Sequence, residues 1–293
     1  MIPYARQSIS RADIDAVVEV LQSDFLTQGN MVPAFEQAVC EYTGAGFAVA
    51  ANSGTSALHI ACLSLGLQPR DWLWTSAITF VASANCGRFC GAGVDFVDID
   101  KNRWNIDVDK LAAKLETASR SGRLPKILVV VHMAGLPADM QRIYQLSKRY
   151  GFFVIEDACL ALGASYQEKP VGNCQFSEVT VFSFHPVKAI TSGEGGMAVT
   201  NDGQLAQKMR LFAGHGVSRD PQQMTKKPDG DWYYQQIALG YNYRLSDIHA
   251  ALGLSQLKRL DEFIQKRRAI ASVYDKALEL LPLQTPLYLS LIH

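Results

Sequence analysis

The stretch VFSFHPVKAITSGEGG, residues 181–196, carries the features on which the interpretation of this chain depends. Ser183 follows an extended apolar run, Pro186 interrupts regular structure, and Lys188 lies in a turn-rich segment that ends in glycines. A lysine held among apolar residues at the edge of a sheet is a candidate nucleophile, because desolvation lowers its pKa from about 10.4 and exposes the neutral amine. A lone loop lysine is more often an exposed charge, so the surrounding sequence must decide between the two interpretations.

Extended runs and helical patterns alternate on both sides of this stretch, which is typical of a mainly parallel sheet covered by helices. Seven runs are strand candidates: residues 47–51, 72–75, 94–99, 126–131, 152–157, 179–184 and 196–201. Helices are expected near residues 34–42, 57–65, 80 onward, 107–116 and 139–150. The sequence therefore predicts an α/β fold.

The two ends of the chain also show helical patterns. Ser10 can cap a first helix in which four apolar residues recur at helical spacing: Ile14, Val17, Val18 and Leu21. From Ser246 the pattern is helical again, with an apolar face that we expect to continue toward Leu280. We divide the chain into a major domain, residues 1–245, and a long helix that begins a smaller domain, residues 246–293.

Polar residues that directly follow strand candidates are candidates for ligand binding, because ligands of open parallel sheets bind at the carboxyl ends of the strands. The turn SGTS, residues 53–56, precedes a helix whose first amides can hold a phosphate. A simple helix cap is the alternative. Asp157 ends another strand and is either catalytic or a cap, while Glu156 points to the opposite side of that strand.

The composition excludes several classes of protein. The 293 residues include 28 basic and 28 acidic side chains, so no net charge attracts nucleic acid or an anionic membrane. The longest apolar run, residues 127–131, is too short to span a bilayer, and no leader is recognisable at the start. The six cysteines are scattered, which favours reduced thiols of a cytoplasmic protein over disulfides or a metal site.

Five motifs, in this order, closely resemble the DegT/DnrJ-type sugar-nucleotide aminotransferases: NSGTSALHIA, ITFVASAN, VIEDACLALGASY, FSFHPVKAITSGEGG and GYNYRLSDIHAALGLSQL. The resemblance covers nearly the whole chain. It implies fold type I of the pyridoxal 5′-phosphate (PLP) enzymes, the aspartate-aminotransferase fold, with a mainly parallel seven-stranded sheet and helices on both faces. The opening YARQSI and DFLTQG are most similar to members that act on the route to pseudaminic acid.

The resemblance also implies roles for individual residues. Lys188 would bond covalently to PLP and carry the proton, and Asp157 would pair with the pyridine nitrogen, where a carboxylate favours the protonated ring. Phe80 would stack on that ring. The cofactor phosphate would be held by a small group of residues: Gly54, Thr55, Ser56 and Ser183.

Further contacts, with the cofactor for Asn242 and with the substrate for Arg244, are implied in the same way. Asn242 and Arg244 would reach the neighbouring subunit's site in a homodimer with shared active sites, although a capped polar loop explains them equally well without the motif. The nucleotide-sugar pocket would be lined by residues near the start of the chain: Tyr4, Asp24, Phe25, Leu26 and Thr27. The expected reaction takes the amino group of glutamate to a UDP-linked 4-keto-6-deoxy sugar.

Two departures from the family pattern motivate an alternative function. Leu160 stands where these enzymes usually carry histidine or glutamine beside the cofactor, and leucine donates no hydrogen bond. The chain ends at His293, so we expect the C-terminal small domain to be largely absent. The alternative is a catalytically silent PLP-fold protein that binds cofactor or a partner without turnover.

Overall fold

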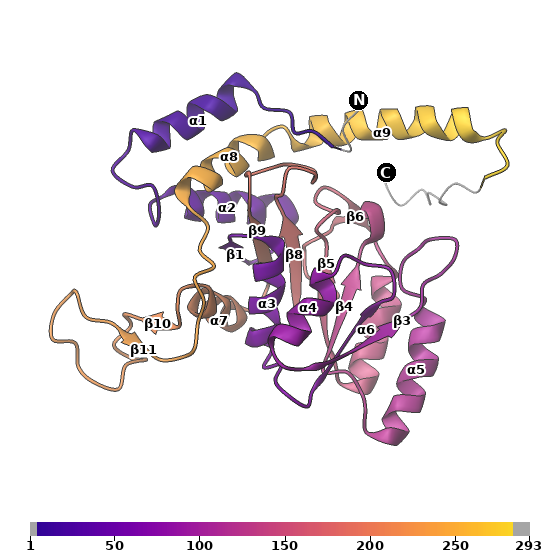
Figure 1. Ribbon diagram of the computed structural model, residues 1–293, viewed down its shortest axis with the longest axis horizontal. Coiled ribbons are helices and arrows are strands. Elements are labelled where there is room, and N and C mark those ends of the chain that lie inside the picture. The colour runs from indigo at the N-terminus through magenta and orange to yellow at the C-terminus, as the bar shows by residue number, and fades with distance from the viewer. Residues whose placement is uncertain (1–4, 284–293) are drawn as a thin grey trace.

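A sheet of seven strands forms the centre of the computed structural model, which describes residues 5–283 (Figure 1). Its order is β1-β9-β8-β5-β4-β2-β3; β9 runs antiparallel to both neighbours, and the other pairs are parallel. The strands are β1 (Phe47–Ala51), β2 (Trp72–Ser76), β3 (Gly93–Val97), β4 (Ile127–Val131), β5 (Phe153–Asp157), β8 (Val179–Ser183) and β9 (Gly196–Thr200). These are the seven predicted strands, so the expected mainly parallel sheet is confirmed.

Helices cover both faces of this sheet, because successive side chains of a strand point to opposite sides. Val49 and Ala51 of β1 pack with α3 (Gly54–Ser64), α4 (Ala82–Phe89) and α7 (Gly203–Ala213) on one face. Ala48 and Ala50 pack with α2 (Met31–Thr43) and α8 (Asp247–Leu257) on the other. The rest of that second face is covered by α5 (Val108–Ser121) and α6 (Met140–Tyr150).

Helix α1 (Arg11–Leu21) begins at Ser10 as expected, with a capping box between Ser10 and Asp13. Its apolar spacing predicted the helix but not the side that is buried: Ile14 is 46% exposed and Leu21 55%. Asp13 is buried instead and accepts hydrogen bonds from Ser255 Oγ and Gln256 Nε2 of α8, both 2.7 Å. The helix therefore docks on α8 through polar contacts.

The helical segment after Ser246 consists of two helices, α8 and α9 (Leu260–Leu278). The expected continuous buried face ends early, since Leu260 is the last fully buried apolar residue among those described up to residue 283 and Val273 is 67% exposed. Because α8 packs against α1 and α2, it belongs to the layer over the sheet, while α9 extends beyond it (Figure 1). The division of the chain at residue 245 stays a prediction.

Three short features were not predicted. Helix α7 follows β9 directly and is capped by Asp202. Its buried residues recur at helical spacing, a pattern overlooked in the sequence: Leu205, Ala206, Met209 and Ala213. Two small hairpins, β6–β7 (Ser165–Tyr166, Lys169–Pro170) and β10–β11 (Val217–Ser218, Gln235–Gln236), also form. All six cysteines are free thiols. Within residues 5–283, no helix is both long and apolar enough to cross a membrane.

Candidate active site

The N-terminus of α3 lies directly against the carboxyl ends of two central strands. A Cβ atom on Gly54 would come within 2.9 Å of Ser183 Cβ, at the end of β8, and 3.2 Å of Cys159 Sγ, just beyond β5. Any side chain at position 54 would therefore displace one of these neighbours. Glycine allows the start of the helix to meet the edge of the sheet, where the structure brings together the predicted turn at residues 53–56 and Ser183.

The hydrogen bonds of this turn separate its capping residues from those that remain open. Ser53 Oγ accepts from the Ser56 amide at 3.1 Å, so the predicted cap exists. The Ser56 hydroxyl donates to Asn52 Oδ1 at 2.6 Å and is committed within the chain. A helix leaves its first amides without an intrahelical partner, so those of Gly54 and Thr55 stay available to an anion beside the Thr55 hydroxyl. The turn thus caps its helix and can also bind a phosphate.

Asp157 is the last residue of β5 and is 6% exposed. Its Oδ2 accepts the Ser83 hydroxyl at 2.6 Å, and its Oδ1 accepts the Cys159 amide at 3.3 Å. Since Ser83 uses its proton on Asp157, its 2.7 Å contact with Thr79 Oγ1 must be a bond donated by Thr79. Thr79, Ser83 and Asp157 therefore form a directed chain of hydrogen bonds that orients the carboxylate.

Glu156 lies on the opposite side of β5, as predicted from strand alternation. Its carboxylate contacts His132 Nε2 at 2.7 Å and accepts from the hydroxyls of Ser177 and Thr180. His132 Nδ1 accepts the Ala138 amide, so Nε2 carries the proton given to Glu156. The two adjacent carboxylates do not share a site.

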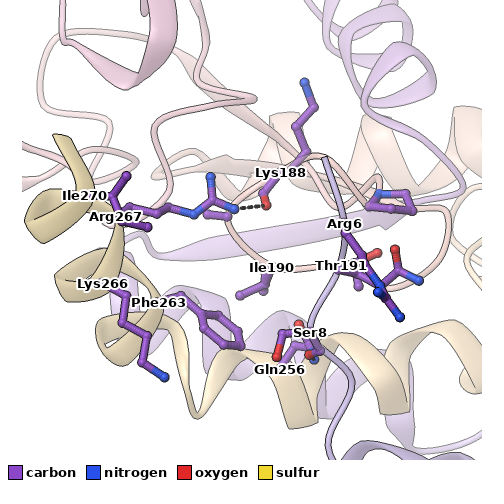
Figure 2. A pocket seen from close by; sticks show the side chains of 13 residues that line it. Arg6, Ser8, Lys188, Ile190, Thr191, Gln256, Phe263, Lys266, Arg267 and Ile270 are labelled. Atoms are coloured by element: carbon purple, nitrogen blue, oxygen red, sulfur yellow. Dashed lines mark hydrogen bonds between the residues drawn. The ribbon is translucent and has the colours of Figure 1, made fainter. Parts of the chain in front are cut away.

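Lys188 lies in the loop after β8 and is partly buried. Burial raises the pKa of the neighbouring Cys159 thiol, the Asp157 carboxylate raises it further, and the Lys188 ammonium opposes them. Lys188 follows β8, and Asp157 ends the adjacent parallel strand β5, so both residues lie at the same edge of the sheet. Figure 2 shows the Lys188 amine pointing away from a cavity of about 170 Å³ on the other side of the loop.

The sequence profile of the DegT/DnrJ/EryC1/StrS aminotransferase family matches residues 7–291. The chain belongs to this family. It is therefore a PLP-dependent aminotransferase of fold type I, as the motifs predicted.

Named relatives of this aminotransferase are similar over most of its length. It is 43% identical over 280 residues to UDP-4-amino-4,6-dideoxy-N-acetyl-beta-L-altrosamine transaminase of Campylobacter jejuni, covering 95% of this chain and 70% of the relative. It is 38% identical over 281 residues to the spore coat polysaccharide biosynthesis protein SpsC of Bacillus subtilis, covering 96% and 70%.

Solved structures agree with this assignment. Helicobacter pylori PseC, an aminotransferase involved in the biosynthesis of pseudoaminic acid, superposes with a TM-score of 0.84 at 36% identity, over 96% of this chain and 71% of that one. The PLP-form of a sugar aminotransferase of Streptococcus pneumoniae gives 0.82 at 27% identity, over 95% and 72%.

The residues of the aminotransferase fit PLP. The glycine-lined start of α3 offers amides to the phosphate, and the close approach at Gly54 leaves no side chain in its way. Asp157 ends β5 and Lys188 follows the adjacent parallel strand β8, so both lie at the carboxyl edge of the sheet to which the start of α3 is also joined. Phe80, expected to stack on the ring, is 71% exposed just before α4.

The predicted substrate residues lie at the surface. Residues 24–27 are exposed between α1 and α2, and the Leu26 carbonyl accepts the amide of Asp247 at 3.0 Å. Asn242 and Arg244 are also exposed, and the Asn242 carbonyl accepts from Asn52 beside the start of α3. Tyr4 lies outside the described residues. Their roles toward substrate stay predictions.

Sequence reasoning missed two residues that support the site. Ser83 belongs to the motif ITFVASAN, in which only Phe80 had been singled out, although the helical spacing of Thr79 and Ser83 places both on one side. Asp247 of the last motif is buried, and its carboxylate accepts the amides of Gly29, Met31 and Val32. It thereby caps α2 from a distant part of the chain, which no local pattern reveals.

Proposed function

We propose that this aminotransferase transfers the amino group of glutamate to a 4-keto-6-deoxy sugar carried on UDP. The observation that carries the proposal is that Asp157 and Lys188 follow adjacent parallel strands, β5 and β8, at the sheet edge against which the open amides at the start of α3 lie. The relatives from C. jejuni and H. pylori, whose names refer to aminated sugars, support the sugar class. The exposed residues Asp24, Phe25, Leu26 and Thr27, together with Tyr4, are the proposed lining of the nucleotide-sugar pocket.

In the proposed mechanism, bound PLP supplies the aldehyde that receives the amino group and the ring that accepts the electron pair released at the substrate carbon. Lys188 would hold the cofactor covalently, and its neutral amine would move a proton at the substrate carbon. Asp157 holds a proton at the pyridine nitrogen. Ser83 fixes the rotation of the Asp157 carboxylate, and the amides of Gly54 and Thr55, with Thr55 Oγ1 and Ser183 Oγ, bind the phosphate.

We further propose a cytoplasmic homodimer in which Asn242 and Arg244 reach the site of the second subunit. Arg244 makes no hydrogen bond or ion pair within residues 5–283, so its guanidinium is free for an anionic group. Light scattering of the purified protein tests the dimer. Mixing Lys188→Ala protein with Arg244→Ala protein tests the shared sites, because exchange of subunits should restore part of the activity that each variant lacks.

The decisive experiment combines absorbance with chemical trapping. The purified chain should bind PLP with an absorbance change, borohydride should fix the cofactor on the peptide that contains Lys188, and glutamate should convert the bound cofactor to its amine form. Lys188→Ala protein is the control and should show no trapping. Trapping elsewhere would contradict the proposed site, and trapping at Lys188 without any reaction with glutamate would identify the silent protein instead.

A further inference from the structure

The loop that carries Lys188 is held at its base by local hydrogen bonds. The Ser192 amide and the Thr191 hydroxyl both donate to the Phe184 carbonyl, at 2.9 Å and 3.0 Å. The Lys188 amide donates to the His185 carbonyl at 2.9 Å, within the same loop. These bonds close the loop, but they leave the carbonyl of Lys188 to be fixed by another part of the chain.

Helix α9 supplies that contact. Arg267 Nη2 donates to the Lys188 carbonyl oxygen at 2.9 Å, as the dashed line in Figure 2 shows. The contact joins residues 79 positions apart and is the one hydrogen bond that the structure gives to this carbonyl within residues 5–283. Arg267 forms no ion pair in that part of the chain, whereas the adjacent Lys266 pairs with Glu262 at 2.5 Å.

The base of α9 is packed against the same loop, so the position of Arg267 is well defined. Leu260 is fully buried, and Phe263 and Ile264 pack against a core cluster that includes Ile190. Arg267 is one turn farther along and lines the cavity beside the loop. The loop and the helix therefore form one packed unit with the guanidinium at its rim.

We propose that Arg267 is a positioning residue for Lys188. The carbonyl of Lys188 faces Arg267 on the cavity side, and its amine leaves in the opposite direction, away from the cavity (Figure 2). Fixing this peptide group fixes the direction in which the side chain departs from the backbone. The inference rests on the proposed role of Lys188 as the residue that binds the cofactor.

Adjacent arginines of α9 provide a matched pair of variants. Arg267→Gln and Arg268→Gln each remove one positive charge from an exposed residue of the same helix, but Arg268 forms no hydrogen bond to the loop. In cofactor-free protein, Arg267→Gln should speed amide hydrogen exchange of residues 185–192 by about fivefold, the scale of one exposed hydrogen bond. Arg268→Gln should leave it unchanged, and Arg267→Lys should recover part of the protection because lysine keeps a charged donor on a longer side chain than that of glutamine.

With PLP present, Arg267→Gln should weaken cofactor retention by a similar factor and shift the pH midpoint of the absorbance of PLP bound at Lys188. Equal rates of amide hydrogen exchange in the two glutamine variants would overturn the proposal. A shift of the pH midpoint that is equally large in Arg268→Gln would overturn it as well. Circular dichroism reports whether α9 persists. If the unaltered chain failed to trap PLP at Lys188, the proposed function would fall, whereas exchange in cofactor-free protein would still decide whether Arg267 orders the loop.

Discussion

The two faces of β5 at its carboxyl end present neighbouring carboxylates in opposite environments. Glu156 is surrounded by donors, from His132, Ser177 and Thr180, and no ligand is needed to satisfy it. Asp157 receives one hydroxyl at 2.6 Å and one amide at 3.3 Å, and it lies at the sheet edge next to the end of β8 and the start of α3. A saturated carboxylate stabilises the fold, whereas one with acceptor capacity to spare can act on a ligand.

The largest expected effect separates the two faces by activity. Asp157→Asn should slow the glutamate half-reaction roughly 10³-fold, because an amide no longer favours a protonated ring nitrogen. The unfolding temperature should change little, since asparagine can still accept the Ser83 hydroxyl. Stopped-flow absorbance and thermal unfolding measure the two quantities. If Asp157→Asn lowered the unfolding temperature but kept full activity, Asp157 would stabilise the fold, as Glu156 does, and would not act on the cofactor.

The reverse result is expected on the other face. Glu156→Gln replaces an acceptor-only group by an amide whose two N–H donors face hydroxyls and His132, so it should cost about 3 kcal/mol of unfolding free energy. Cofactor trapping at Lys188 should persist in the protein that stays folded. Urea unfolding gives the first quantity and peptide mass the second. Unchanged stability would show that the network around Glu156 contributes nothing to the fold.

The pH dependence of stability sharpens the same contrast. Burial alone would raise the pKa of Glu156, but the hydrogen bonds from His132, Ser177 and Thr180 outweigh it and leave this pKa below its ordinary value of 4.5. A depressed folded-state pKa contributes stability above pH 4.5 that is lost as the pH falls through the folded value. Urea unfolding should therefore show the stability gap between the native chain and Glu156→Gln narrowing below that pH. A difference in unfolding free energy that stays constant with pH would show that these hydrogen bonds do not lower the pKa of Glu156.

The comparison also shows what the sequence could reveal. Strand alternation placed Glu156 and Asp157 on opposite faces, and all seven strands were found, because buried strands form continuous local apolar runs. Contacts between segments that are distant in the sequence could not be predicted, because no local pattern encodes them. Asp247 caps a helix 216 residues earlier, and Arg267 reaches Lys188 across 79 residues. The buried side of α1 was equally hidden, since it depends on polar partners in α8.

A smaller effect is expected from the support of Asp157. Ser83→Ala removes a 2.6 Å hydrogen bond to the carboxylate and should reduce PLP affinity and the half-reaction rate by about tenfold. Ser83→Thr keeps the hydroxyl and should restore most of the loss. Ser64→Ala is a matched control, because the Ser64 hydroxyl is equally buried and has no partner in the described chain. If Ser83→Ala and Ser64→Ala changed the PLP affinity and the half-reaction rate equally, Ser83 would contribute through packing alone.

The smallest expected effect concerns Leu160, which lies three residues after Asp157 and is 44% exposed. Leucine offers no hydrogen bond there, whereas the resemblance to the family led us to expect histidine or glutamine at this position. Leu160→His should raise the glutamate half-reaction rate about threefold, the scale of one modest hydrogen bond. Stability should stay within about 0.5 kcal/mol, because the side chain is half exposed.

Val273→His is the control for Leu160→His, since Val273 is 67% exposed on α9. It should leave the half-reaction unchanged. If both variants behaved alike, position 160 would not face the cofactor. If Leu160→His alone accelerated the reaction, the Asp157 face would be shown to have room for a further polar group, whereas the Glu156 face has its carboxylate already saturated.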